Sequence, residues 1–155
     1  MVGSYEDQLA EAAILAAFIP VTMSMAGNAG LQASAVAVQG IATGALWSGD
    51  ILYRLLKELL AALFNGAVAG TLLGLLVLSA SFVVPLDAPL RLALATSLSL
   101  LCVTTLAAMV GATVPIVLDK IGIDPAMAIG VFITSSNDVL GVLIFFLMAT
   151  TFYLG

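Results

Sequence analysis

Asp138 is the only charged residue between positions 125 and 155. It lies in the run Ile133-Thr134-Ser135-Ser136-Asn137-Asp138-Val139-Leu140, whose polar centre is flanked by apolar segments. Because no lysine, arginine or histidine lies in this stretch, a carboxylate here must be protonated, hydrated or bound to a cation that comes and goes. These states correspond to three hypotheses for Asp138: a neutral residue hydrogen-bonded between helices, a proton relay, or a cation site.

The residues around Asp138 divide by helical periodicity. Residues three or four positions apart share a face of a helix, so the spacing predicts a small, polar stripe made of Gly130, Thr134, Asp138 and Gly141. Ser136 and Asn137 point away from this stripe, and we expect them to hold helices together.

The choice of ion follows from the available ligands. The chain has no histidine and only one cysteine, Cys102, so Zn²⁺ or Cu²⁺ would lack their usual ligands. One carboxylate is too little for a divalent cation, but a symmetric homodimer with this helix at its axis would bring two copies of Asp138 together. Two carboxylates plus backbone carbonyls suit Mg²⁺, which keeps much of its hydration shell.

The elements that must position Asp138 are membrane helices. The chain is 63% hydrophobic and 8% charged, and its mean hydropathy is +1.24. Windows 12–49, 59–86 and 92–118 carry no charge, and each is longer than the roughly 20 residues that cross a bilayer core. We expect an all-α, multi-pass protein of the cell membrane, surrounded by lipid, with no nucleic-acid partner. Its single transmembrane domain, residues 1–155, would have four spans. The first would cover about 9–26 and continue as 31–43, and the other three would cover about 59–84, 90–118 and 125–153.

Three local patterns refine these spans. Gly27-Asn28-Ala29-Gly30 is a poor continuation of a helix, which predicts a break or kink in the first span that faces protein or water. Residues 48–58 carry Asp50, Arg54, Lys57 and Glu58 on one side, which predicts a short amphipathic interfacial helix. The small residues Gly66, Gly70 and Gly74 predict a ridge that another helix approaches closely, or glycines that a membrane helix merely tolerates.

Basic residues indicate the orientation of the chain in the membrane. Arg54, Lys57 and Lys120 fall on one side of the four expected spans, and Arg91 falls on the other. Since basic residues favour the cytoplasm, both ends of this chain are expected outside the cell. An additional span before this sequence would return the start of the protein to the cytoplasm.

Several motifs together resemble the transmembrane domain of the MgtE family of Mg²⁺ channels. They occur in the order of the family: Phe18-Ile19-Pro20, the run from Met25 to Ser34, Leu56-Lys57-Glu58-Leu59, Asp124-Pro125-Ala126, and the run from Phe132 to Gly141. The resemblance implies a homodimer of five-span subunits with a Mg²⁺-selective pore on the two-fold axis, lined by the first and fourth spans of this chain. The first span of the family and its cytoplasmic regulatory domains have no counterpart here.

The resemblance also implies the site residues. The pore aspartate of the family matches Asp138. The residues whose carbonyls surround hydrated Mg²⁺ match Gly27, Gly30 and Thr134, with Gly130 one turn earlier than Thr134.

The sequence therefore predicts the pore domain of a Mg²⁺ channel or transporter. The transported ion could also be Mn²⁺, Co²⁺ or Ca²⁺, and the alternatives are a carrier or exchanger of another divalent cation, or a membrane assembly module without transport activity. No nucleophile, acid/base pair or phosphate-binding glycine loop is recognisable, so we do not expect an enzyme.

Overall fold

The computed structural model describes residues 2–46, 51–128 and 130–153. Within these ranges the chain forms four long helices, α1 (Val2–Ala42), α2 (Ile51–Ala80), α3 (Pro89–Lys120) and α4 (Val131–Phe152), and a short 3-10 turn, η1 (Pro125–Ala128). Four stretches of these helices are long and apolar enough to cross a membrane, namely Ala13–Ala42, Ile51–Ala80, Pro89–Lys120 and Phe132–Phe152. The prediction of an all-α fold with four spans is confirmed.

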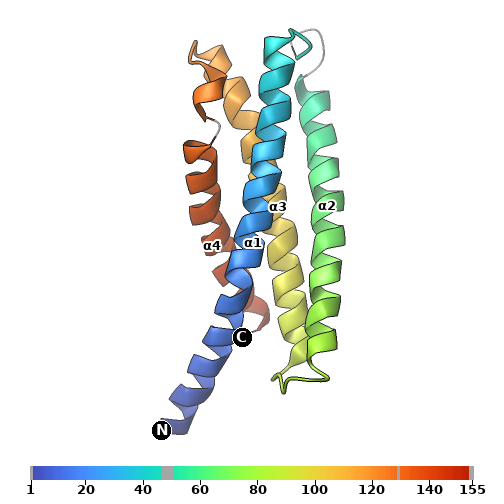
Figure 1. Ribbon diagram of the computed structural model, residues 1–155, viewed down its shortest axis with the longest axis vertical. Coiled ribbons are helices and arrows are strands. Elements are labelled where there is room, and N and C mark those ends of the chain that lie inside the picture. Colours follow the sequence, from blue (N-terminus) through green and yellow to red (C-terminus); the bar gives the residue numbers. More distant parts are fainter. Residues whose placement is uncertain (1, 47–50, 129, 154–155) are drawn as a thin grey trace.

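The four helices run up and down in a bundle (Figure 1). Helix α3 contacts each of the other three long helices, and α1 also contacts α4. Large side chains fill the core near one end of the bundle, including Leu15, Leu92, Phe145 and Tyr153. A second core cluster consists of Ala33, Ala62, Ala108 and Ala112, so α1, α2 and α3 approach one another closely there.

Helix α1 is not interrupted at Gly27–Gly30: one α-helix runs from Val2 to Ala42, so the predicted break is wrong, and the alternative of a kink within a continuous helix stays a prediction. A glycine in a helix costs about 1 kcal/mol relative to alanine, and tertiary packing readily offsets that cost. Here Gly30 is buried against α3 and α4, and an added Cβ would collide with the Asn137 side chain in its present position. Pro20 also lies inside α1, and the helix leans away from the bundle toward its N-terminal end (Figure 1).

Helix α2 includes the residues expected to form a separate interfacial helix. Residues 51–58 are its first two turns, and 48–50 lie outside the described residues. The glycine ridge on α2 packs against α3, as one of the two readings predicted. An added Cβ would lie 2.8 Å from the Thr104 hydroxyl at Gly66 and 2.7 Å from the Ser97 carbonyl oxygen at Gly70.

Three hydroxyl groups of α3, those of Thr96, Ser99 and Thr104, bond to carbonyls of their own helix, whereas the buried hydroxyl of Thr105 has no partner within the described residues. Thr96 donates to the carbonyl of Leu92 at 2.8 Å, and Ser99 donates to the carbonyl of Ala95 at 2.6 Å. Such bonds let a polar side chain sit in an apolar interior without an unpaired donor. These two hydroxyls therefore serve the packing of α3.

The fourth span starts later than expected. Pro125 begins the 3-10 turn η1, and the Asp124 carboxylate accepts a hydrogen bond from the Ala126 amide at 2.9 Å. Helix α4 begins at Val131, after Gly130, whose φ of 99° and ψ of −110° interrupt the helical path. A residue with a Cβ rarely adopts such a conformation, so glycine determines where α4 can start.

Candidate functional site

Asp138 lies on α4, about two turns after the helix begins, and its side chain is exposed on the surface of the single chain. An ionised carboxylate at membrane depth costs on the order of 2.5–3.5 kcal/mol on insertion scales. Exposure to lipid would leave that cost uncompensated. An ionised Asp138 would therefore need water, a cation or a second protein surface outside this chain.

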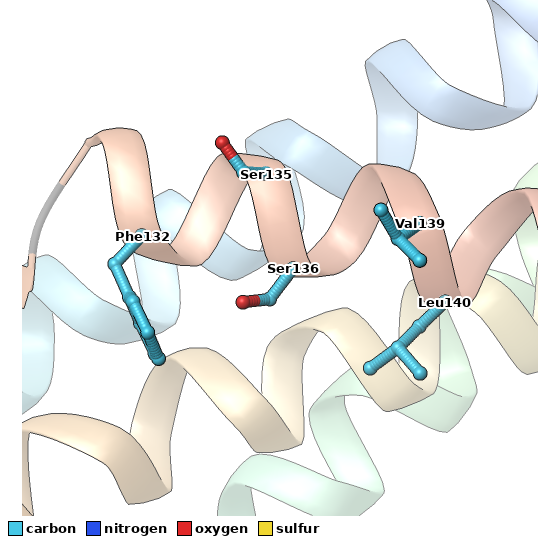
Figure 2. Close-up of a pocket in the computed structure, with 5 residues that line it drawn as sticks. All are labelled: Phe132, Ser135, Ser136, Val139 and Leu140. Carbon is cyan, nitrogen blue, oxygen red and sulfur yellow. The ribbon is translucent and has the colours of Figure 1, made fainter.

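The α4 surface next to Asp138 is a shallow hollow lined by Phe132, Ser135, Ser136, Val139 and Leu140. Figure 2 shows the Ser136 hydroxyl between the side chains of Phe132 and Leu140, whereas the Ser135 hydroxyl points in a different direction from the same helix. Phe132 and Val139 are more than half exposed, at 60% and 63%. This face of α4 is thus apolar, with two hydroxyl groups, and Asp138, the only carboxylate of the helix, is not among the residues that line it.

Thr134 and Gly130 precede Asp138 on the same helix. Thr134 is half-buried one turn before Asp138, and its amide donates to the Gly130 carbonyl at 2.9 Å. A carbonyl oxygen has two lone pairs, so this bond leaves Gly130 a second acceptor position. Among the described residues other than its chain neighbours, no atom lies within 4 Å of an added Cβ at Gly130, so that side of the residue is open to the rest of the described chain.

Gly27 and Gly30, expected to act together, face different surroundings. Gly27 is half-buried, and nothing lies within 4 Å of an added Cβ there. Gly30 is buried: an added Cβ would collide with the Asn137 amide nitrogen and would lie 3.1 Å from the Ala107 carbonyl oxygen. The Gly30 carbonyl itself packs against Gly111 of α3. Gly27 therefore borders open space, while Gly30 forms a helix crossing.

Two contacts between α1 and α4 give the positions of Gly27 and Asp138 along this pair of helices. Gly30 packs against Asn137, and Gly141 packs against Met23, whose sulfur would lie 2.9 Å from an added Cβ. Because the helices are antiparallel (Figure 1), these contacts bracket Gly27 on one helix and Asp138 on the other. The two residues thus lie at the same level along the α1–α4 pair.

The stripe predicted on α4 is only partly correct. Gly141 is buried against Met23 of α1 and Val103 of α3, so it does not share the exposed side of Asp138. Residue 141 is rotated about 60° from residue 138 around the helix axis, and that rotation takes it into the bundle. Asn137 is 3% exposed and packs against α1, as expected for a residue that holds helices together.

Within the described residues, no three histidine, cysteine, aspartate or glutamate side chains come together as a metal site. One chain therefore offers a single carboxylate, together with the open sides of Gly27 and Gly130 and the nearby Thr134. This arrangement could contribute one half of a site for a hydrated hard cation.

Comparison with known proteins agrees with these features. The family model MgtE, described as a divalent cation transporter, matches residues 19–148. The chain is 37% identical over 152 residues to the magnesium transporter MgtE of Enterococcus faecalis, a match that covers 98% of the chain and 32% of that relative. The corresponding transporter of Bacillus subtilis is 34% identical, with the same coverage.

A third magnesium transporter MgtE, from Thermus thermophilus, is 30% identical over 145 residues, which are 94% of the chain and 31% of the relative. The chain thus spans about a third of the length of the curated relatives it matches. The match to the family model includes Gly27, Gly30, Gly130, Thr134 and Asp138.

Proposed function

Because the chain belongs to the MgtE family of divalent cation transporters, we propose that it is the pore region of a Mg²⁺ transporter and conducts hydrated Mg²⁺ across the membrane. The chain is a multi-pass membrane protein. The observation that carries the proposal is the exposed carboxylate of Asp138 on a membrane-spanning helix. Such a group is costly in lipid and useful in a cation pathway.

Two chains form the functional unit in this proposal. A homodimer with α4 beside its two-fold axis brings two Asp138 carboxylates toward one ion and removes both from lipid. Gly27, Thr134 and Gly130 supply carbonyl oxygens to the hydration shell of the ion. Gly30 supplies a carbonyl oxygen if its contact with Gly111 leaves the second lone pair accessible.

The ligand set favours Mg²⁺ over softer metals. Carboxylate and carbonyl oxygens suit hard cations, and Mg²⁺ exchanges its bound water reluctantly, so it can pass while still largely hydrated. Selection then depends on the size of the hydrated ion and on the paired negative charge. Mn²⁺, Co²⁺ and Ca²⁺ are the competitors to compare in the same assay.

The test measures Mg²⁺ flux into liposomes that contain the purified chain. We expect Asp138→Asn to reduce the flux strongly, because the substitution keeps the shape of the side chain and removes its charge. Asp87→Asn is the matched control, since Asp87 is an exposed carboxylate in the α2–α3 connection. Equal flux through the Asp138→Asn and parent proteins would contradict the site.

The same assay separates the alternatives. A Mg²⁺ current driven by an imposed membrane potential, without dependence on a counter-ion, is expected for a channel and excludes an exchanger. If neither flux nor saturable divalent-cation binding is found, the chain is an assembly module and not a transporter.

A further inference from the structure

The amide side chain of Asn137 is buried where α4 crosses α1 and α3. The residue is 3% exposed, and within the described residues neither its amide nitrogen nor its amide oxygen has a hydrogen-bond partner. The amide nitrogen occupies the space that a Cβ of Gly30 would need. The position of that added Cβ lies 3.1 Å from the Ala107 carbonyl oxygen and 3.4 Å from the Ile133 side chain. Asn137 thus fills a notch that exists because residue 30 is glycine.

A second glycine, Gly111 of α3, lets the backbone of α1 approach α3 closely at Gly30. An added Cβ at Gly111 of α3 would collide with the carbonyl oxygen of Gly30 and lie 3.0 Å from its Cα. Helix α1 therefore rests backbone to backbone on α3 at this level. The two glycines and Asn137 form one three-helix contact. The absence of a side chain at Gly111 leaves space for the backbone of Gly30, and its absence at Gly30 leaves space for Asn137.

A buried asparagine is a poor choice for packing alone, because an unpaired amide is unfavourable in an apolar interior. Its established use between helices is to specify one arrangement at some cost in stability. The amide has no hydrogen-bond partner in the notch either, so what favours this rotation of α4 is the fit of the Asn137 side chain into the space beside Gly30, not its polarity.

The orientation of Asp138 follows from that of Asn137. Successive residues of a helix point about 100° apart, so burial of residue 137 against α1 directs residue 138 toward the exposed side. We propose that Asn137 is a positioning residue for Asp138: by occupying the notch beside Gly30, it fixes the rotation of α4 and hence the direction of the carboxylate. The role of Asp138 in ion passage rests on the proposed function, whereas the rotation itself does not.

The first experiment measures rotation without any transport. In a Cys102→Ser background, which removes the free cysteine, the Asp138→Cys chain is labelled with a water-soluble maleimide in detergent. Adding Asn137→Leu, which replaces the amide by a bulkier apolar group with the same number of non-hydrogen atoms, should change the labelling rate severalfold. Gly30→Ala, which blocks the notch, should change it in the same direction.

Gly70→Ala is the matched control for this experiment. It adds a methyl group 2.7 Å from the Ser97 carbonyl oxygen in the α2–α3 contact, away from α4. We expect this variant to lower the melting temperature but to leave the labelling rate at position 138 unchanged. Helix content and a cooperative melting transition verify folding of each chain. In the Gly30→Ala background, Asn137→Ser shortens the obstructing side chain and should restore part of the original labelling rate.

The second experiment measures Mg²⁺ flux with Asp138 intact. Loss of a group that orients a metal ligand commonly lowers metal affinity by roughly 10–100-fold. We therefore expect Asn137→Leu to raise the Mg²⁺ concentration for half-maximal flux by about tenfold. Gly70→Ala should leave that concentration unchanged, although it disturbs packing.

The two proposals fail in different ways. Unchanged labelling at position 138 in folded Asn137→Leu and Gly30→Ala chains would overturn the positioning role, whatever the flux. A changed labelling rate together with normal flux through the Asp138→Asn chain would support the positioning role and contradict the proposed function.

Discussion

The Asn137 side chain on α4 occupies the space beside Gly30 on α1 that a larger residue at position 30 would fill. Asn137 and Asp138 are neighbours in sequence, yet one is buried in this contact and the other is exposed. The contact joins a packing feature of the bundle to the orientation of the only carboxylate of α4. Several consequences can be measured in the purified chain.

Gly111→Ala should destabilise the bundle. The added methyl group would collide with the Gly30 carbonyl oxygen and lie 2.9 Å from the Gly30 carbonyl carbon, and backbone atoms cannot move as a flexible side chain can. Overpacking of this kind typically costs about 1–3 kcal/mol. Thermal unfolding in detergent measures the loss. Gly27→Ala is the control, because nothing lies within 4 Å of an added Cβ there; an equal loss in both variants would contradict the α1–α3 contact.

Gly130→Ala should also destabilise the chain, but for a conformational reason. Space is available for a methyl group, yet the backbone φ of 99° disfavours any residue with a Cβ. Residues held in such conformations cost on the order of 1–3 kcal/mol. The melting temperature should fall, and amide hydrogen exchange in the first turn of α4 should accelerate. Unchanged exchange in that turn would show that Gly130 does not determine where α4 starts.

Arg54→Met should loosen the contact between the end of α1 and the start of α2. The Arg54 guanidinium donates to the Val36 carbonyl at 3.0 Å and packs against Gly40. Because this bond is solvent-exposed, we expect a loss of only about 1 kcal/mol. Chemical unfolding followed by circular dichroism measures the change. Arg91→Met, at an exposed position at the other end of the bundle, should have a smaller effect.

Mg²⁺ should stabilise the parent chain against heat, and the Asp138→Asn chain much less. A ligand that binds only the folded state at a hundred times its Kd adds about 2.7 kcal/mol of stability. A Mg²⁺ titration of the melting temperature tests this expectation, with the Asp87→Asn chain as control. Equal Mg²⁺ stabilisation of the Asp138→Asn and parent chains would place the bound ion elsewhere.

Much of the fold could be predicted from the sequence. Three charge-free windows longer than a bilayer core, and a fourth apolar stretch interrupted only by Asp138, predicted four membrane helices, because uncompensated charge is costly in lipid and helices satisfy their own backbone. Periodicity also placed Gly66, Gly70 and Gly74 on one packed face of α2 and separated Asn137 from Asp138, since residue spacing alone determines which side chains share a helix face.

The sequence by itself therefore determined the number of spans, the isolated carboxylate and the rotation between Asn137 and Asp138. Only the tertiary structure decided that α1 continues through Gly27–Gly30, because the weak helix propensity of glycine is overridden by the close approach of Gly111. It also decided that Gly30 and Gly141 face the bundle while Gly27 borders open space. Periodicity gives relative directions around one helix, whereas the direction that faces a neighbour depends on how the helices pack.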